Sequence, residues 1–504
     1  MFATMSSAVV EGVDGHPVTV EVHVSNGLPG YTLVGLPDVS CRESRDRVRA
    51  AILSSGLDWP LRRVTINLAP SSIRKHGSAL DLPIALCVLA ASGQIEPAML
   101  NRLGAVGELG LDGSLRPVRG LACLADAVEG ERVIVPTDGA GEAAVVRTGA
   151  VLGAGTLGQI VAALRSGGMP LTLVDTPPAC EPEVGQADLA DVRGQPLARW
   201  GLEVAAAGGH HLLMVGPPGS GKTMLASRLV GLLPDLQPDQ AVIATRVHSA
   251  AGVGLPKGGL VRRPPLRAPH HGASVVSLVG GGTAALRPGE ISCAHGGVLF
   301  LDELGEFVPA ALDSLRQPLE EGLVRVARAA RTATLPARFL LVAAMNPCPC
   351  GEGGGAGRCR CSEPARARYA RRLSGPLLDR FDIRIEVRPP PAAVLLDNAQ
   401  EEATAEVAAR VARVRLLAQQ RGVECNALLP ADRLDEVVPL TASAKSVLQV
   451  ALESNDLTGR GLNRIRTVAR TIADLLGADI IDHEIIGSAL SMRSRPVSVL
   501  GMAS

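Results

Sequence analysis

Two early segments of the chain alternate apolar and polar residues as a half-buried β-strand does. They are VTVEVHV at 18–24 and RVTINLA at 63–69, where every second residue is apolar. A mostly apolar run at 81–91 has the length and spacing of a helix instead. Residues 1–170 are therefore predicted to form an N-terminal domain of short strands and helices.

The middle of the chain, residues 190–390, alternates short apolar runs with helical patterns. This alternation is typical of a parallel sheet covered by helices, an α/β domain. The predicted strands are HLLMVG at 211–216, VLFLD at 298–302, FLLVAAM at 339–345 and RFDIRIEV at 380–387.

Two stretches separate this core from its neighbours. Residues 171–189 include TPPACEPEVGQ, whose prolines and acids predict a linker. After PPPAAV at 389–394, apolar residues recur every three or four positions, which predicts a helical C-terminal domain over 391–504.

Composition narrows the class of protein. With 504 residues, 46% of them hydrophobic, the chain predicts two to four soluble globular domains. Its 50 acidic and 50 basic residues balance, so any nucleic-acid contact must come from local clusters of charge. No secretory signal or membrane span is expected, and scattered single cysteines favour a reducing cytoplasm.

The strongest motif is GPPGSGKT, which follows an apolar strand and opens a helical segment. Its glycines would let backbone N–H groups curl around phosphates. Lys222 would reach the outer phosphates and Thr223 would hold Mg²⁺, so ATP and Mg²⁺ are the expected cofactors. The expected nucleotide-binding residues of this loop are Gly216, Pro217, Pro218, Gly219, Ser220, Gly221, Lys222 and Thr223.

Four further residues lie where predicted strands begin or end. Asp302 and Glu303 follow VLFL, and acids at this edge of a sheet can hold Mg²⁺ and polarise the attacking water. Asn346 ends the next apolar strand and could orient the same water. Arg380 begins RFDIRIEV, where it could reach a neighbouring subunit's phosphate. From spacing alone, Asn346 and Arg380 fit ordinary capping or salt-bridged residues equally well.

Together these stretches resemble the YifB/ComM family of magnesium-chelatase-like AAA+ ATPases, over nearly the whole chain. The matching stretches include RAPHHGAS at 267–274, PGEISCAHGGVLFLDEL at 288–304, AAMNPCPCG at 343–351 and LDRFD at 378–382. Of these, RAPHH and NPCPCG are highly specific to this family. The resemblance implies a central AAA+ P-loop sheet and a C-terminal helical lid. It also implies that the chain self-associates as a hexameric ring, and that ComM members are DNA helicases that drive branch migration.

The same resemblance assigns roles to single residues. It makes Asp302 the metal-coordinating acid, Glu303 the general base, Asn346 sensor 1 and Arg380 a finger acting on the adjoining subunit. Arg460 corresponds to the sensor 2 arginine, with Arg464 as a substitute, and Gln195 to part of the adenine-side contact.

The N-terminal domain resembles the Lon-protease-like (S5-like) α+β fold of this family. Lon proteases use a serine activated by a lysine. Here the serine position falls on Ala79, or at best on Ser78, and no lysine stands between Lys75 and Lys222. Proteolysis is therefore not expected, and an inactive scaffold or a DNA-guiding role is preferred.

Four cysteines form a C-P-C-x8-C-x-C pattern. Thiolates at Cys348, Cys350, Cys359 and Cys361 could close a tetrahedral Zn²⁺ site, although C-x-C is tighter than the usual C-x2-C. A redox pair or a metal-free loop remains open as the alternative.

Two arginine-rich segments are the candidates for contact with DNA. One is a predicted pair of strands at 323–336 and the other is RCRCSEPARARYARR at 358–372. Arginine binds backbone phosphates well, and aromatic residues at 2% offer few stacking platforms, so contacts to branched or single-stranded DNA should be independent of sequence. A solvated helix face or subunit contacts is the alternative. The candidate arginines are Arg325, Arg328, Arg331, Arg366, Arg368, Arg371 and Arg372.

Three functions remain in play. The leading prediction is a DNA-dependent ATPase that works as a helicase or branch-migration translocase in DNA uptake, recombination or repair. A chelatase-type motor is the first rival, although it gives no role to the N-terminal domain or the cysteine cluster. A protein-remodelling AAA+ ATPase is the second. His270 and His271, between the phosphate loop and VLFLDE, are expected to serve packing or DNA contact.

Overall fold

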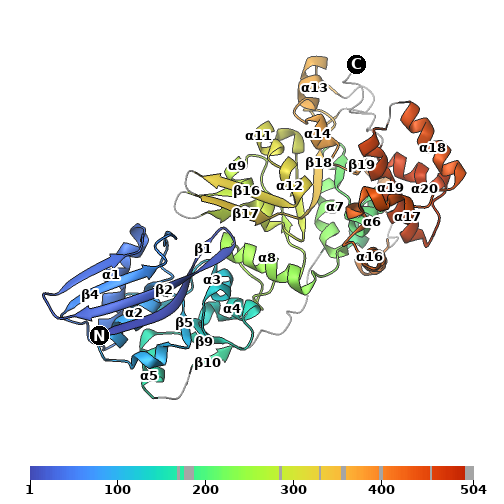
Figure 1. Cartoon of the computed structure of the whole chain (residues 1–504). Coiled ribbons are helices and arrows are strands. Elements are labelled where there is room, and N and C mark those ends of the chain that lie inside the picture. The colour runs from blue at the N-terminus through green and yellow to red at the C-terminus, as the bar shows by residue number, and fades with distance from the viewer. Residues whose placement is uncertain are drawn as a thin grey trace.

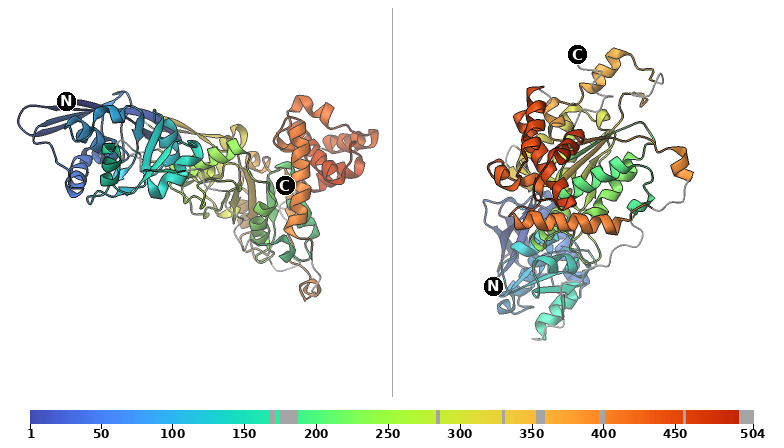
Figure 2. Two further views of the ribbon diagram at one scale, coloured as in Figure 1. Left: turned by 90° about the horizontal axis from the view of Figure 1, so that it is seen from below. Right: turned by 90° about the vertical axis from the view of Figure 1, so that its right-hand side faces the viewer.

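The computed structural model places three groups of elements along one elongated molecule (Figure 1). A large N-terminal sheet lies at one end, a parallel sheet in the middle and a helical bundle at the other end, as the turned views also show (Figure 2). The structure describes residues 1–166, 171–174, 187–282, 286–328, 331–352, 359–396, 401–454 and 457–493.

The N-terminal sheet has eight strands in the order β10-β9-β8-β5-β1-β2-β4-β3. Strands β1, β2 and β4 pair antiparallel, while β1, β5, β8 and β9 pair parallel, so the sheet is mixed. Its strands are β1 (Phe2–Glu11), β2 (Asp14–Ser25), β3 (Gly30–Val34), β4 (Arg63–Ala69), β5 (Leu103–Ala105), β8 (Arg132–Pro136), β9 (Val151–Ala154) and β10 (Thr172–Val174), and a small hairpin adds β6 (Glu108–Leu109) and β7 (Leu115–Arg116).

Helices cover this sheet. Helix α2 (Asp81–Ala91) packs on β1 and β2. Every one of its residues is buried, as its apolar sequence predicts. The other helices of this part are α1 (Val39–Ser54), α3 (Leu121–Ala127), α4 (Ala140–Val146) and α5 (Leu157–Arg165).

The central sheet is parallel throughout, in the order β12-β15-β18-β11-β19. It comprises β11 (Leu212–Val215), β12 (Leu266–Arg267), β15 (Val298–Leu301), β18 (Leu340–Met345) and β19 (Ile383–Glu386). The three inner strands are buried on both faces, which explains why they are continuous apolar runs rather than alternating ones. Leu212 and Met214 of β11 face one hydrophobic core, and Leu213 and Val215 face another.

The two faces carry different elements. The face of Leu212 packs on helices α6 and α7 and on the C-terminal helices, and the face of Leu213 on α8 to α11 and a hairpin. The helices are α6 (Pro196–Gly208), α7 (Lys222–Leu229), α8 (Pro238–Ala251), α9 (Val275–Val279), α10 (Glu290–Cys293), α11 (Pro309–Asp313), α12 (Arg316–Glu321), α13 (Glu363–Ala370) and α14 (Gly375–Leu378), and the hairpins are β13 (Gly280–Gly281) with β14 (Arg287–Pro288) and β16 (Leu323–Arg328) with β17 (Arg331–Pro336).

The C-terminal helices pack against α6 through α16 and α19. Apolar spacing in α19 predicts one buried stripe, and the structure buries Ile465, Val468 and Ile472 there. These helices are α15 (Ala392–Leu396), α16 (Thr404–Gln420), α17 (Leu434–Val437), α18 (Ala442–Glu453), α19 (Gly459–Leu476) and α20 (His483–Ser491).

The mixed α/β class, the parallel central sheet and the helical C-terminal part are confirmed. All four predicted core strands exist, as does the hairpin predicted at 323–336. The Lon-protease-like identity of the N-terminal part stays a prediction, and so do the domain boundaries.

Candidate nucleotide-binding site

The phosphate loop lies between the end of β11 and the start of α7. Gly219 and Gly221 have φ of 75° and 91°, a backbone region that glycine adopts without steric cost. A Cβ at Gly216 would lie 2.1 Å from the carbonyl oxygen of Val387, so the loop packs closely on the chain after β19. Nothing lies within 4 Å of a Cβ added at Gly219, which leaves the mouth of the loop open.

Lys222 begins α7 and is only 8% exposed. Its Nζ donates to the carbonyl oxygens of Gly216 and Pro217, each at 2.8 Å, and to Asn346 Oδ1 at 3.3 Å. Burial lowers the pKa of this amine, and the Asp302 carboxylate raises it in part. The hydrogen bonds of this buried cation go only to neutral oxygens, and the amine lies beside a helix N-terminus. Both features suit the binding of a phosphate group.

Thr223 and Asp302 meet beside this amine. The Thr223 hydroxyl donates to Asp302 Oδ2 at 2.7 Å, although 79 residues separate them in sequence. A hydroxyl and a carboxylate oxygen are ligands that Mg²⁺ accepts alongside substrate phosphates. The pair therefore fits the predicted magnesium site.

Glu303 follows Asp302 in a left-handed backbone conformation, with φ of 52°. Its backbone N–H donates to Asp302 Oδ1 at 2.9 Å. A non-glycine residue in this region is uncommon and costs about 1 kcal/mol or more, which is typical of functional positions. Glu303 is thus held beside Asp302, with a side chain that is 54% exposed.

The Glu303 carboxylate has a partner that the sequence interpretation missed. His271 Nδ1 lies 2.9 Å from Glu303 Oε2, and the neighbouring His270 ring lies against the His271 ring, with 4.0 Å between the centroids and a tilt of 34°. The APHH motif was visible in the sequence, but nothing in its spacing pointed to an acid 32 residues later. The expectation for His271, packing or DNA contact, did not include this pair.

Asn346 directly follows β18, and its amide oxygen accepts a hydrogen bond from Lys222 at 3.3 Å. Tyr369 of α13 lies beside this position. Burial raises the pKa of its hydroxyl to about 12, and the backbone N–H of Asn346, which donates to that hydroxyl, lowers this pKa in part. The Tyr369 ring also fills the space at Gly305, where an added Cβ would lie 2.4 Å from its hydroxyl oxygen. Tyr369 therefore links the Asn346 loop to the loop that carries Glu303.

Gln195 precedes α6 and braces the phosphate loop. Its Nε2 donates to the Ser220 carbonyl at 2.6 Å and to that of Arg388 at 3.4 Å. The side chain is 7% exposed, and its Oε1 has no hydrogen-bond partner among the described residues. This placement is close to the phosphate loop, and the adenine contact itself stays a prediction.

Arg380 lies at the amino ends of the central strands, whereas the phosphate loop lies at their carboxyl ends. Strand β19 pairs with β11 in parallel register, Leu212 with Ile383 and Val215 with Glu386. Arg380 precedes the first pair and the phosphate loop follows the last, so the strands alone separate them by about 13 Å. Arg380 forms an ion pair with Glu320 of its own chain.

Other arginines gather at these amino ends. Burial lowers the pKa of Arg380, and so do the positive charges of Arg464, Arg460 and Arg316. Arg464 donates to the Arg380 carbonyl at 2.7 Å and to Asp382 at 2.6 Å. The structure thus brings Arg380, Arg460 and Arg464 together, at a distance from the phosphate loop of the same chain.

The arginines proposed for DNA contact have varied surroundings. Arg325 is 57% exposed and pairs with Glu321 at 3.0 Å. Arg372 donates to the Gly305 carbonyl at 2.7 Å and to Glu306 at 3.0 Å, so it binds within its own chain. Arg368 and Arg371 are exposed on and after α13, and Arg366 is partly buried. The side chains of Arg328 and Arg331 lie outside the described part of the structure.

A buried histidine precedes β15. His295 is 4% exposed, its Nδ1 accepts the backbone N–H of Arg338 at 3.1 Å and its Nε2 lies 3.1 Å from Gln240 Oε1. Burial, followed by the charge of Arg338, lowers the pKa of His295 to about 4. The imidazole is therefore neutral near pH 7, with Nε2–H as the donor to Gln240.

The N-terminal residues considered for proteolysis are not arranged as a serine–lysine pair. Ser78 donates to the Glu108 carboxylate, and the fully buried Lys75 donates to the Pro70 carbonyl. Ala79 is buried and lies two residues before the start of α2. The expectation that the chain lacks Lon-type proteolysis stays a prediction.

Three family models match the chain: "Magnesium chelatase, subunit ChlI" over residues 188–395, "Subunit ChlI of Mg-chelatase" over 20–139 and "Magnesium chelatase, subunit ChlI C-terminal" over 401–493. Across the described residues, none of the helices is long and apolar enough to cross a membrane.

Three relatives align over nearly the whole chain. An uncharacterized protein of Mycobacterium tuberculosis is 44% identical over 497 residues, 97% of each chain. The uncharacterized protein YifB of Escherichia coli is 44% identical over 490 residues, 96% of this chain and 95% of its own. Competence protein ComM of Haemophilus influenzae is 42% identical over 498 residues, 98% of this chain and 97% of its own. With the phosphate loop and the acids at the same sheet edge, these matches confirm the predicted resemblance: the chain belongs to the YifB/ComM family of magnesium-chelatase-like AAA+ proteins.

Proposed function

We propose that this protein is an ATP-driven ring motor that acts on DNA, as a helicase or branch-migration translocase. The observation that carries the ATPase part is the convergence of Lys222, Thr223, Asp302, Glu303 and Asn346 at one edge of the central sheet. Ligands of open α/β sheets bind at that edge. No other described part of the chain combines a phosphate loop with paired acids.

Each residue has a role in hydrolysis. Lys222 binds the outer phosphates, and Thr223 and Asp302 hold Mg²⁺, which neutralises phosphate charge when it is bound. Glu303 accepts a proton from water as the water oxygen bonds to the γ-phosphorus and the bond to the bridging oxygen breaks. Asn346, whose Oδ1 accepts from the Lys222 amine at 3.3 Å, orients that water.

The separation of Arg380 from its own phosphate loop supports a ring. A side chain that starts about 13 Å beyond the loop, at the other edge of the sheet, is suited to a neighbour's γ-phosphate instead. Arg460 and Arg464 lie beside it and would approach the same neighbour. In the isolated chain, the Glu320 ion pair neutralises Arg380, and ring assembly would exchange that partner for a phosphate.

The DNA part rests on the relatives and on exposed arginines. One of the three relatives is the competence protein ComM of Haemophilus influenzae, and competence involves the uptake of DNA. Arg325, Arg368 and Arg371 are exposed and could contact phosphates without reading sequence. Transformation, recombination and repair are all compatible with such contacts, and the cytoplasm is the compartment we propose.

One rival has an observation in its favour. The family models carry magnesium-chelatase descriptions, and one of them matches residues 20–139. The N-terminal part therefore does not count against a chelatase-type motor, contrary to the argument made from the sequence. Such a motor, or one that remodels proteins, would hydrolyse ATP at the same site but would not respond to DNA.

The test is the rate of ATP turnover with no DNA, with single-stranded DNA, with duplex and with a four-way junction. We expect the junction or single strand to raise the rate severalfold at low salt and the rise to shrink as salt increases. Lys222→Ala is the control without turnover. A rate that no DNA changes, together with no DNA binding at low salt, would exclude the helicase proposal and leave the ATPase intact.

A further inference from the structure

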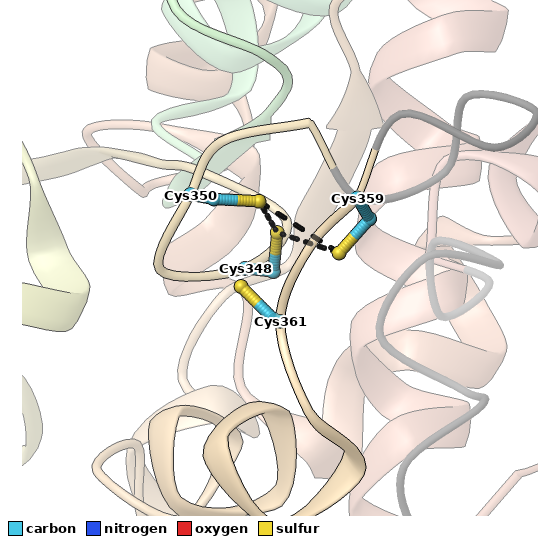
Figure 3. A group of neighbouring side chains, drawn as sticks. All are labelled: Cys348, Cys350, Cys359 and Cys361. Atoms are coloured by element: carbon cyan, nitrogen blue, oxygen red, sulfur yellow. Dashed lines mark hydrogen bonds between the residues drawn. The ribbon is translucent and has the colours of Figure 1, made fainter.

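The four clustered cysteines come from two short stretches of the chain. Cys348 and Cys350 follow Asn346, and Cys359 and Cys361 precede α13 (Figure 3). Their sulfur atoms all lie within 4.8 Å of one another, and Cys348 is buried while the other three lie nearer the surface. The four side chains point toward a common centre in Figure 3.

The distances between the sulfurs fit one metal ion. A tetrahedral Zn²⁺ with Zn–S bonds of about 2.3 Å requires sulfurs about 3.8 Å apart. Cys348 Sγ lies 3.3 Å from Cys350 Sγ and 3.7 Å from Cys359 Sγ, and Cys350 and Cys359 are also 3.7 Å apart. A disulfide requires about 2.05 Å, and a redox pair would leave two of the four sulfurs without a role.

The surrounding backbone also suits thiolates. The N–H groups of Glu352 and Arg360 donate to the Cys350 sulfur. Such N–H···S contacts stabilise a charged sulfur that is bound to a metal and orient it toward the ion. No carboxylate or imidazole joins the cluster among the described residues, so the donor set is four sulfurs, which favours Zn²⁺ over Mg²⁺ or Mn²⁺.

The cluster lies directly on the nucleotide site. A Cβ at Gly351 would lie 2.5 Å from Pro218 Cδ, so the first cysteine turn rests on the phosphate loop. After Cys361, Ser362 caps α13, and the Tyr369 ring of α13 fills the space at Gly305. An ion bound here would therefore join the Asn346 loop, the phosphate loop and, through α13, the loop that follows Glu303.

We propose that Cys348, Cys350, Cys359 and Cys361 bind one structural Zn²⁺ that fixes α13 to the Asn346 loop. All four positions of the ion are filled by protein sulfurs, as in a closed structural site, so the metal takes no part in hydrolysis. Its role is to hold Asn346 and Tyr369 at their places beside the phosphate loop.

The test is the metal content of the full-length protein, purified without chelators and analysed by inductively coupled plasma mass spectrometry. We expect about one zinc per chain in the native protein and less than about 0.1 in Cys359→Ser and Cys361→Ser. Cys87→Ser is the matched control, because this cysteine is buried in α2 away from the cluster, and it should keep its zinc. Replacement by Co²⁺ should give the visible absorption bands of a tetrahedral thiolate site in native and control proteins only.

Less than about 0.1 zinc per chain in the native protein, both as purified and after zinc addition and desalting, would overturn the proposal. Iron in place of zinc at one or more atoms per chain, or full zinc in both cluster variants, would overturn it as well. These measurements use neither ATP nor DNA, so they are independent of whether the proposed motor function is correct.

Discussion

Replacing His271 by alanine tests whether the pair with Glu303 restrains hydrolysis. In the structure, the imidazole engages one carboxylate oxygen of the proposed general base. A base whose oxygen already accepts a hydrogen bond is a weaker acceptor for the proton of water. We therefore expect the DNA-independent rate of ATP turnover to rise when His271 is removed.

The size of the rise follows from the exposure of the pair. The His271 side chain is 35% exposed and that of Glu303 is 54% exposed, so solvent screens their interaction. Exposed pairs of this kind contribute about 0.2–1 kcal/mol. Since 1 kcal/mol corresponds to about a fivefold change in rate, the basal rate should rise by about 1.5-fold to fivefold.

The assay is steady-state phosphate release at saturating ATP, with and without DNA. His270→Ala is the matched control, because the His270 ring lies against the His271 ring while its own Nδ1 accepts the N–H of Gly272 at 3.1 Å. The control should keep the native basal rate. A fall of tenfold or more in His271→Ala, with nucleotide affinity unchanged, would refute the reasoning and show that His271 positions the base.

Three further predictions concern the base, the ring and the buried histidine. Glu303→Gln should bind ATP with native affinity and lose hydrolysis by about 10²-fold or more, since the amide cannot take a proton; native turnover would contradict the assignment. Lys222→Ala and Arg380→Ala should each be inactive alone, whereas mixed rings should recover part of the turnover, because some sites then combine an intact loop with a neighbour's intact arginine; no recovery in mixed rings of normal size would count against action on the neighbour. Burial lowers the pKa of His295 to about 4 in the folded chain, so as pH falls below about 6.5 the unfolded chain binds a proton before the folded chain does. The contribution of neutral His295 to the free energy of unfolding is therefore complete above about pH 6.5 and is lost toward pH 4. Urea unfolding at pH 7 and pH 5 should therefore differ by about 2 kcal/mol more in the native protein than in His295→Gln, and equal differences would remove His295 from the explanation.

The inner strands of the central sheet were predictable because burial on both faces requires continuous apolar runs. The opening strand β1 was not predicted, and its residues explain why. Ser7 lies on the inward face, fully buried, and its hydroxyl donates to the Ala105 carbonyl at 2.8 Å. A polar residue on the buried face interrupts the alternation that identifies a strand.

The contact between His271 and Glu303 could not be predicted from the sequence, for a different reason. Strands β12 and β15 pair in parallel register, with Arg267 opposite Leu299. His271 lies four residues after Arg267, and Glu303 lies four residues after Leu299. The register of the two strands therefore brings both side chains to the carboxyl ends of the strands. Strand β12 has two residues, which is too short to leave a periodic signal in the sequence.

The N-terminal part is attached to helix α8, which follows the phosphate-loop helix α7, and this attachment restricts its motion relative to the central sheet. Helix α8 packs on α3, the Ser249 hydroxyl donates to the Glu142 carboxylate and the Gly120 N–H donates to the Ser249 carbonyl at 3.1 Å. Arg246 reaches Asp126 at 3.4 Å from the same helix.

The turn between β1 and β2 adds a second attachment, because a Cβ at Gly12 would lie 3.1 Å from Ala333 of the β16–β17 hairpin. Two attachments to the same ATPase core oppose independent rotation of the N-terminal sheet. If subunits of a ring shift during turnover, each N-terminal sheet should therefore move with its own core. A guide for DNA that is carried rigidly by each subunit fits this arrangement better than a flexibly tethered domain does.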